Sequence, residues 1–148
     1  IIVYGFCLSY IGYILVPAIG PRFTLHNYEM NNIEMPGILI TNFLRMVVNN
    51  AESVPAGTIN PAAFVQRDCF PSGHTQMTLL VIFLSMKFKS RVRWFFAING
   101  VLLIFATVYL RYHYVADLIG GFVFMLFTFW SGKYIYGWWS KEKAEISN

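Results

Sequence analysis

The stretch VADLIGGFVFMLFTFWSGKYIYGWW occupies residues 115–139 and decides the class of fold. It is apolar over the length that an α-helix needs to cross a membrane, about 20 residues for roughly 30 Å of hydrocarbon. Three other apolar runs precede it, at residues 1–19, 70–86 and 94–112. We therefore expect an all-α fold, a polytopic transmembrane bundle of about four spanning helices.

The composition supports a membrane protein. Hydrophobic residues make up 57% of the 148 residues and charged residues only 12%, against about a quarter in a soluble domain. The aromatic content of 18% also fits, because Trp and Tyr collect at membrane interfaces. The net charge of +4 comes from basic residues that flank the apolar runs instead of forming one stripe. This distribution argues against nucleic acid as a partner and favours the lipid bilayer instead.

Lys and Arg predict how the helices are oriented. The loop at residues 87–93 carries four of the eleven, and the C-terminal end of the chain carries Lys133, Lys141 and Lys143. If four helices alternate, both regions lie on one side, which the positive-inside rule makes cytoplasmic. The polar segment 22–68 and the turn around His113 then lie on the extracytoplasmic or lumenal side of an integral, multi-pass membrane protein.

We expect a single transmembrane domain over residues 1–140, which would carry any catalytic site, and a disordered cytoplasmic tail over 141–148. The chain begins without Met inside an apolar run, so we expect one or more upstream helices to be missing. Residues 38–48 are apolar but too short to cross and contain Arg45, which favours an interfacial or re-entrant helix. The two cysteines are expected to be free thiols, and no oligomeric state is predicted.

The motif Pro71-Ser72-Gly73-His74 opens the second run. Ser is a preferred N-cap, and Pro is common near the first turn of a helix. Gly73 allows a ligand to approach the backbone, and the free N–H groups at a helix start favour an anion. His74 would then face the bound anion. An ordinary capped helix start with an incidental histidine explains the tetrapeptide equally well.

His113 and Asp117 are spaced i, i+4, which places them on one face of a helix. The carboxylate can then accept a hydrogen bond from one ring nitrogen and leave the other free to attack, the arrangement of an oriented nucleophile. An ionisable pair at a membrane boundary is costly unless it has a function. A buried His–Asp pair that merely joins two helices is the alternative.

Alternation of the helices places both motifs, together with Gly20-Pro21-Arg22, on the same outer face. In this order and spacing the chain resembles the type 2 phosphatidic acid phosphatase superfamily of membrane lipid phosphatases and phosphotransferases. The resemblance covers roughly residues 16–121. The Pro-Ser-Gly-His motif is complete at 71–74, and the last family motif is present at His113 and Asp117.

Two of the three family motifs are altered. The lysine of the first motif falls at Leu15, and the Ser-Arg pair of the last motif falls at Ala106-Thr107. The Gly-Pro-Arg version of the first motif resembles the branch that contains inositol phosphorylceramide synthase-like transferases. Arg111 follows Thr107 by one helical turn, and we expect it to project from the same face and replace the missing Arg as a phosphate ligand.

The resemblance implies a lipid phosphate or diphosphate phosphatase. His113 would attack phosphorus to form a phosphohistidine, oriented by Asp117, and His74 would protonate the leaving oxygen and then activate water. The phosphate would be held by Arg22, Ser72, Gly73 and Arg111. We expect no metal and no other cofactor.

Three alternatives stay open. Transfer of a phospho-head group to a lipid alcohol differs only in which acceptor reaches the phosphohistidine. A non-catalytic membrane protein would carry a structural His113–Asp117 pair. A metal site built from His74, His113 and Asp117 lacks an additional carboxylate cluster to support it.

Overall fold

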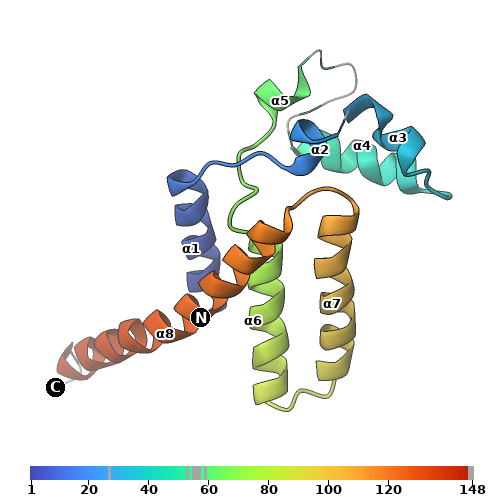
Figure 1. The fold of residues 1–148 in the computed structure, drawn as a ribbon. Helices are drawn as coiled ribbons and strands as arrows, with labels where there is room; N and C mark the ends of the chain where they lie inside the picture. The colour runs from blue at the N-terminus through green and yellow to red at the C-terminus, as the bar shows by residue number, and fades with distance from the viewer. Residues whose placement is uncertain (27, 53, 55–57, 59, 147–148) are drawn as a thin grey trace.

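The computed structural model describes residues 1–26, 28–52, 54, 58 and 60–146, and this part of the chain is helical (Figure 1). Its elements are α1 (Ile2–Leu15), α2 (Pro21–Thr24), the 3-10 helix η1 (Tyr28–Met30), α3 (Asn31–Glu34), α4 (Thr41–Ala51), α5 (Pro61–Phe64), α6 (Gly73–Lys87), α7 (Arg93–Tyr109) and α8 (Val115–Ile146). An isolated bridge pairs Ala18 with Asp68, and the described residues form no strand. The expected all-α class is confirmed.

Four long helices form a bundle in which α6 is central. It packs against α1, α7 and α8, and α1 also packs against α8. The C-terminal end of α1, the start of α6 and the α7–α8 loop all lie at one end of this bundle, where α2 to α5 also gather (Figure 1). The three polar motifs of the sequence are therefore brought to one end of the molecule.

The bundle is polar inside and apolar outside. Several of its most buried side chains are polar, among them Gln76 and Thr128, which are both 0% exposed. Large apolar side chains such as Leu15 and Phe105 are 73% and 68% exposed. A soluble protein rarely presents apolar surface on this scale, whereas lipid chains would cover it without cost.

Among the described residues, one helix is long and apolar enough to span a membrane, the part of α8 from Val115 to Ser140. The helices α1 and α7 are apolar but have only 14 and 17 residues, and α6 has 15. The helix α1 ends at Leu15, short of the expected run 1–19, because Pro17 disfavours helical geometry at Val16. A crossing by four helices stays a prediction.

The helix α4 lies across the end of the bundle (Figure 1). It occupies Thr41–Ala51, slightly later than the expected 38–48, and none of its side chains is buried. The residues before it, Ile38 and Leu39, are 81% and 95% exposed. Its interfacial position stays a prediction.

The C-terminal helix is longer than the last apolar run. It continues to Ile146, through most of the segment 141–148 for which the sequence predicted a disordered tail. Residues 147 and 148 lie outside the described residues, and both the tail and the single-domain boundary at 140 stay predictions.

A buried hydrogen-bond cluster joins α1, α6 and α8. The Gln76 carbonyl oxygen accepts from the Ser9 hydroxyl at 2.7 Å, and the Gln76 amide donates to the Gly5 carbonyl at 2.8 Å and to the Thr128 hydroxyl at 3.2 Å. Polar side chains join helices in this way where no water competes for them. We call this set the Gln76 cluster.

Candidate active site

The start of α6 is fixed by Ser72. Its side-chain oxygen accepts from the Thr75 backbone N–H at 3.3 Å, which makes it the N-cap that the motif predicted. Its own N–H donates to the Asp117 carbonyl at 3.0 Å. This hydrogen bond joins the start of α6 to the first turn of α8.

The end of α7 places His113. The Arg111 N–H donates to Val108 O at 3.0 Å and the Tyr112 N–H to Thr107 O at 2.9 Å, the two bonds of a Schellman motif. Arg111 has φ 63°, the left-handed conformation that this motif requires and that Gly usually supplies. The His113 N–H also bonds to Thr107 O, at 3.1 Å, so the backbone at His113 is tied to the last turn of α7.

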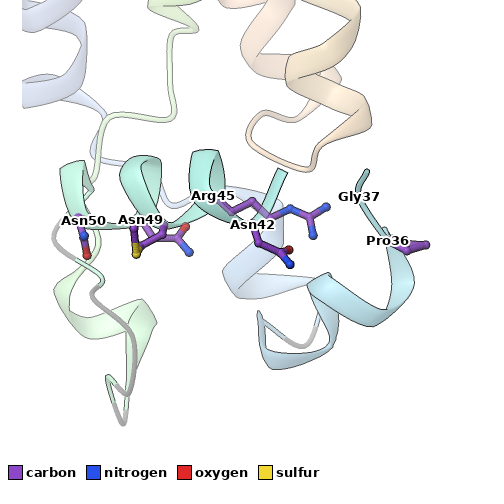
Figure 2. A pocket seen from close by; sticks show the side chains of 7 residues that line it. Pro36, Gly37, Asn42, Arg45, Asn49 and Asn50 are labelled. Atoms are coloured by element: carbon purple, nitrogen blue, oxygen red, sulfur yellow. The ribbon is translucent and has the colours of Figure 1, made fainter. Parts of the chain in front are cut away.

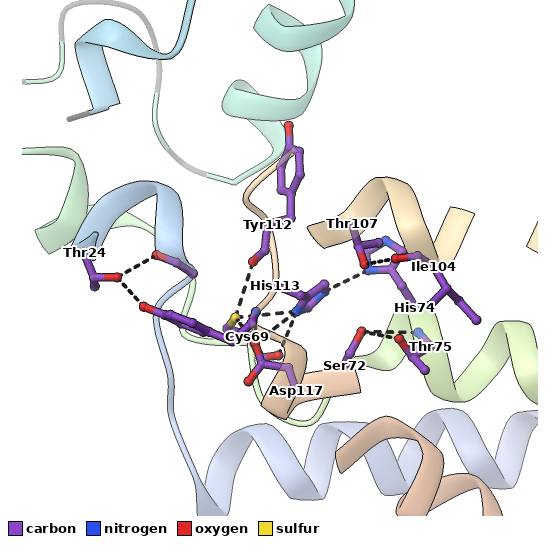
Figure 3. A network of polar contacts seen from close by, with 12 residues as sticks. Thr24, Cys69, Ser72, His74, Thr75, Ile104, Thr107, Tyr112, His113 and Asp117 are labelled. Atoms are coloured by element: carbon purple, nitrogen blue, oxygen red, sulfur yellow. Dashed lines mark hydrogen bonds and ion pairs between the residues drawn. The ribbon is translucent and has the colours of Figure 1, made fainter. Parts of the chain in front are cut away.

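The two ring nitrogens of His113 have different partners. Nδ1 lies 3.0 Å from the Cys69 carbonyl oxygen, which can only accept, so we assign the proton to Nδ1. Nε2 then carries a lone pair, which faces Nδ1 of His74 at 3.4 Å (Figure 3). His113 is buried and His74 is exposed. The buried lone pair of His113 thus lies next to His74, which is exposed and can exchange protons with water.

Asp117 holds the start of α8. Its Oδ2 accepts from the Tyr114 N–H at 2.7 Å, as an acidic residue at the third helical position does in a capping box. The same oxygen accepts from the Cys69 thiol at 2.9 Å. It lies 3.6 Å from His113 Nδ1, beyond hydrogen-bonding distance. The direct His113–Asp117 hydrogen bond that the sequence suggested is replaced by the Cys69 carbonyl, because the carboxylate is engaged elsewhere.

The electrostatics keep His113 neutral and Cys69 protonated. Burial lowers the pKa of His113, the neighbouring His74 lowers it further, and Asp117 acts in the opposite direction. Burial raises the pKa of the Cys69 thiol, and Asp117 reinforces this shift. His113 therefore keeps its lone pair at neutral pH, and Cys69 serves as a hydrogen-bond donor.

A cavity of about 90 Å³ adjoins the two histidines. It is lined by Tyr13, Gly20, Arg22, Phe23, Glu52, Val65, Gln66, Asp68, Cys69, His74, Tyr112 and His113. Positive charge reaches it through Arg22, which is 5% exposed. The cavity thus combines a neutral histidine, a second histidine and a buried guanidinium.

Arg22 is held by rings and by α4. Its guanidinium carbon lies 4.3 Å from the centroid of the Tyr112 ring and 4.5 Å from that of Phe23, distances typical of cation–π contacts. Nη1 donates to Asn49 Oδ1 at 3.2 Å, and Nη2 forms an ion pair with Glu52. Burial lowers the pKa of Arg22, and the nearby tyrosines oppose the shift.

Comparison with known proteins now identifies the family. The family model described as the PAP2 superfamily matches residues 1–131. The chain belongs to the PAP2 superfamily. It is 25% identical over 122 residues to the PA-phosphatase related-family protein of Dictyostelium discoideum. The match covers 82% of this chain and 20% of that protein, so the chain spans about a fifth of the length of this curated relative. No solved structure matches.

Membership of the PAP2 superfamily confirms the resemblance drawn from the motifs and indicates phosphatase- or phosphotransferase-type activity. The likeness of the first motif to the inositol phosphorylceramide synthase-like branch stays a prediction, since the matched family description names no branch. The two motifs that carried the resemblance are the ones that meet at the cavity, through His74 and His113.

Not every predicted residue of this PAP2 chain lines the cavity. Arg111 forms an ion pair with Glu34, because α7 ends at Tyr109 and the chain turns away before Arg111. The Ser72 hydroxyl accepts from Thr75 within the helix cap, and Asp117 lies behind His113. These three residues and Gly73 lie outside the cavity lining, whereas Arg22, His74 and His113 are part of it.

Some cavity residues were not singled out by the sequence. Tyr13 reaches the cavity from α1, and its hydroxyl lies where a Cβ on Gly73 would collide with it, so any larger residue at position 73 would displace the Tyr13 side chain. Cys69 and Glu52 also line it. Only Cys69 carried a signal, its place beside the Pro-Ser-Gly-His motif. Tyr13 and Glu52 are brought in by tertiary packing.

A larger hollow of about 440 Å³ runs along α4 (Figure 2). It is lined by Pro36, Gly37, Asn42, Arg45, Met46, Asn49 and Asn50. Arg45, its charged group, donates to the Met35 carbonyl. This lining contains no histidine, carboxylate or other acid–base group. Although the hollow is the larger of the two, the smaller cavity is therefore the better candidate for an active site.

The donor set at His113 fits a metal poorly. Ligand atoms of Cys69, His113 and Asp117 lie within 4.8 Å of one another. A metal would need the thiolate and an unprotonated Nδ1, so it would have to displace the thiol proton that Asp117 accepts and the Nδ1 proton that the Cys69 carbonyl accepts. The set also differs from the His74, His113 and Asp117 combination considered from the sequence.

Proposed function

We propose that this PAP2 superfamily protein hydrolyses a phosphate ester or diphosphate of a membrane lipid through a phosphohistidine at His113. The observation that carries the proposal is the lone pair of a neutral, buried His113 Nε2, directed at His74 beside a buried Arg22. Nucleophile, proton donor and anion-binding group are thereby assembled around one small cavity.

In the first step, His113 Nε2 attacks phosphorus, an N–P bond forms and the bond from phosphorus to the leaving oxygen breaks. His74, in its protonated form, gives a proton to that oxygen. The bond from Nδ1–H to the Cys69 carbonyl stabilises the positive charge that His113 acquires. Arg22 binds the non-bridging oxygens after exchanging Glu52 for phosphate.

In the second step, the now neutral His74 takes a proton from water, which attacks phosphorus. The N–P bond breaks, and inorganic phosphate leaves with His113 restored. An alcohol in place of water would give transfer instead of hydrolysis. The exposure of His74 supports its role, because a group that protonates and deprotonates in turn must exchange protons with its surroundings.

The other predicted phosphate ligands take narrower roles in this proposal. Gly73 lies in the first turn of α6, where backbone N–H groups favour an anion. Ser72 fixes that turn, and Asp117 fixes the turn that carries His113. Arg111 would contribute only after leaving Glu34.

A lipid substrate is supported by the surroundings of the cavity. Exposed apolar residues cover α1, α7 and α8. The cavity is lined by Tyr13 of α1 and by Tyr112 and His113 of the α7–α8 loop, which lies at the same end of the bundle as the C-terminal end of α1 (Figure 1). A head group would enter the cavity while its chains lie against these apolar faces. By the distribution of Lys and Arg, we place this end on the extracytoplasmic or lumenal side.

A panel assay on the purified protein in detergent tests the proposal. Phosphate release would be followed from phosphatidic acid, phosphatidylglycerol phosphate and a prenyl diphosphate, with EDTA present and with or without diacylglycerol as acceptor. We expect release from at least one lipid, lost in His113→Ala and kept in the matched control His26→Ala, whose side chain is exposed. Turnover that survives His113→Ala would overturn the nucleophile assignment, and loss of activity in EDTA would overturn the metal-free mechanism.

A further inference from the structure

The proposed chemistry uses the backbone carbonyl of Cys69 but not its thiol, yet the thiol lies against both His113 and Asp117. Its side chain is 4% exposed. The sulfur lies 2.9 Å from Asp117 Oδ2, 3.5 Å from His113 Nδ1 and 3.4 Å from the Tyr112 carbonyl (Figure 3). Its carbonyl oxygen accepts from His113 at 3.0 Å. Cys69 therefore contacts both His113, the proposed nucleophile, and the carboxylate of Asp117.

The protons of this group can be assigned one by one. The Cys69 carbonyl only accepts, so the Nδ1 proton of His113 goes to it. The thiol has a single proton, and the carboxylate at 2.9 Å is its shortest and only charged acceptor. Asp117 Oδ2 thus receives two donors, the thiol and the Tyr114 N–H at 2.7 Å. The carboxylate is held while His113 remains 3.6 Å away.

We propose that Cys69 is a positioning residue, whose thiol retains the Asp117 carboxylate and so keeps it from forming a direct hydrogen bond with His113. The inference rests on the proposed function of His113 for its catalytic meaning, but its geometry stands without it. Without the thiol proton, Oδ2 keeps the Tyr114 N–H as a donor, and we expect it to fill the vacated direction by moving toward His113 Nδ1–H at 3.6 Å, which it would share with the Cys69 carbonyl.

This movement has a defined electrostatic consequence. A carboxylate in direct contact with an imidazole favours the charged imidazolium. His113 would then lose its lone pair at a higher pH, and the nucleophile would be inactive over a wider acidic range. The groups that face His113 from the surrounding elements are His74, Asp117, Asp68, Arg22, Glu52 and Cys69, and only the last is changed.

The direct test is an NMR titration of the histidines in the full chain in detergent micelles. The chain has three, and His26→Gln and His74→Gln variants assign the signals. In Cys69→Ala we expect the pKa of His113 to rise by about half to one unit, the latter a tenfold change in proton affinity. Cys69→Ser keeps a hydrogen-bond donor, so the pKa of His113 should rise by no more than half as much as in Cys69→Ala. The matched control Cys7→Ala removes the exposed cysteine and should shift nothing.

The rise in Cys69→Ala together with rescue by Ser would establish the positioning role. An unchanged His113 in Cys69→Ala, or an equal rise in both variants, would overturn it. A purely structural role for Cys69 would lower stability without moving this titration. Activity adds a second readout, because the acid limb of kcat/KM should move upward with the pKa.

Infrared spectroscopy covers the case in which Cys69→Ala does not fold. In Cys7→Ala only the Cys69 thiol remains, and its S–H stretching band should lie at the low frequency of a strong hydrogen bond and shift upward in Cys7→Ala/Asp117→Asn. A band typical of a free thiol would contradict the proposal. Both spectroscopic tests are independent of turnover, so an inactive wild type would count against the proposed function alone.

Discussion

The Gln76 cluster and the His113 site are two buried polar groups in one bundle, and they differ in how their atoms are engaged. In the Gln76 cluster the amide donates twice and accepts once, and every partner is a neutral hydroxyl or carbonyl. In the His113 site the groups titrate, and the lone pair on His113 Nε2 faces another histidine at a cavity.

This difference separates polar groups that hold helices together from polar groups for which we propose a reaction. Neutral groups with all their hydrogen bonds made contribute to packing and cannot change charge within the physiological pH range. A histidine with a nitrogen directed at a cavity can exchange a proton or attack an electrophile. Substitutions in the two regions should therefore alter different measured quantities.

The largest effect is expected at His113. His113→Gln keeps a polar side chain but removes the attacking nitrogen, and we expect kcat to fall by about 10³-fold or more. The unfolding midpoint should change little, since the hydrogen bonds of the surrounding backbone remain. A phosphate-release assay beside a thermal unfolding scan measures both. Retained turnover with lowered stability would reverse the comparison and make His113 structural.

The next effect is expected at His74. His74→Ala removes the proton donor, and we expect a loss of about 10²–10⁴-fold on a lipid phosphate. The loss should be much smaller on p-nitrophenyl phosphate, whose leaving group departs without a proton. Comparing the two substrates in the same variant isolates the acid role. An equal loss on both would mean that His74 serves binding or orientation instead.

A smaller effect, on stability, is expected at Gln76. Gln76→Leu has a similar volume but removes the bonds to Ser9, Gly5 and Thr128, and we expect about 1–2 kcal/mol less resistance to unfolding. The kcat of the folded fraction should stay within a factor of about two. The matched control is Asn99→Leu, because Asn99 is exposed and bonds only within its own helix, to Phe95. Loss of activity without loss of stability would place Gln76 in the chemistry.

The smallest effect is on the pH profile. The pKa of His113 is lowered, so its folded value lies below the usual value of about 6.5. His113 is then neutral above that lowered pKa, and the acid limb of kcat/KM should have its midpoint below about 6.5. Stability should change in the same direction as activity. The unfolded state binds the proton more readily than the folded state, so the free energy of unfolding falls as the pH decreases from about 6.5 through the lowered pKa of His113. An acid limb above 7 would contradict a neutral, buried nucleophile.

The sequence predicted the helices better than the contacts between them. Apolar runs mark helices because the pattern is local, and Ser72 was recognisable as an N-cap from its position before an apolar run. Helix ends were less certain. Pro17 shortened α1, and the left-handed Arg111 ended α7 early, although no glycine marks that position.

The sequence predicted that His74 and His113 lie together, but it did not predict most of the residues that surround them. Motif order placed His74 and His113 together, but the partner of His113 Nδ1 is a backbone carbonyl, which no side-chain pattern shows. Arg111 was expected to reach phosphate, and its pairing with Glu34 depends on how the 22–68 region folds over the bundle. Tyr13 and Glu52 reach the cavity for the same tertiary reason.

The central claim is that phosphate is carried covalently on His113, and trapping that intermediate tests it most directly. Protein incubated with a ³²P-labelled lipid phosphate would be quenched in alkali, which preserves phosphohistidine and hydrolyses phosphoserine, and the label would be located by peptide mapping. We predict label on the peptide that contains His113, lost on mild acid treatment and absent from His113→Gln. Turnover without any trapped label, or label that persists in His113→Gln, would contradict the account.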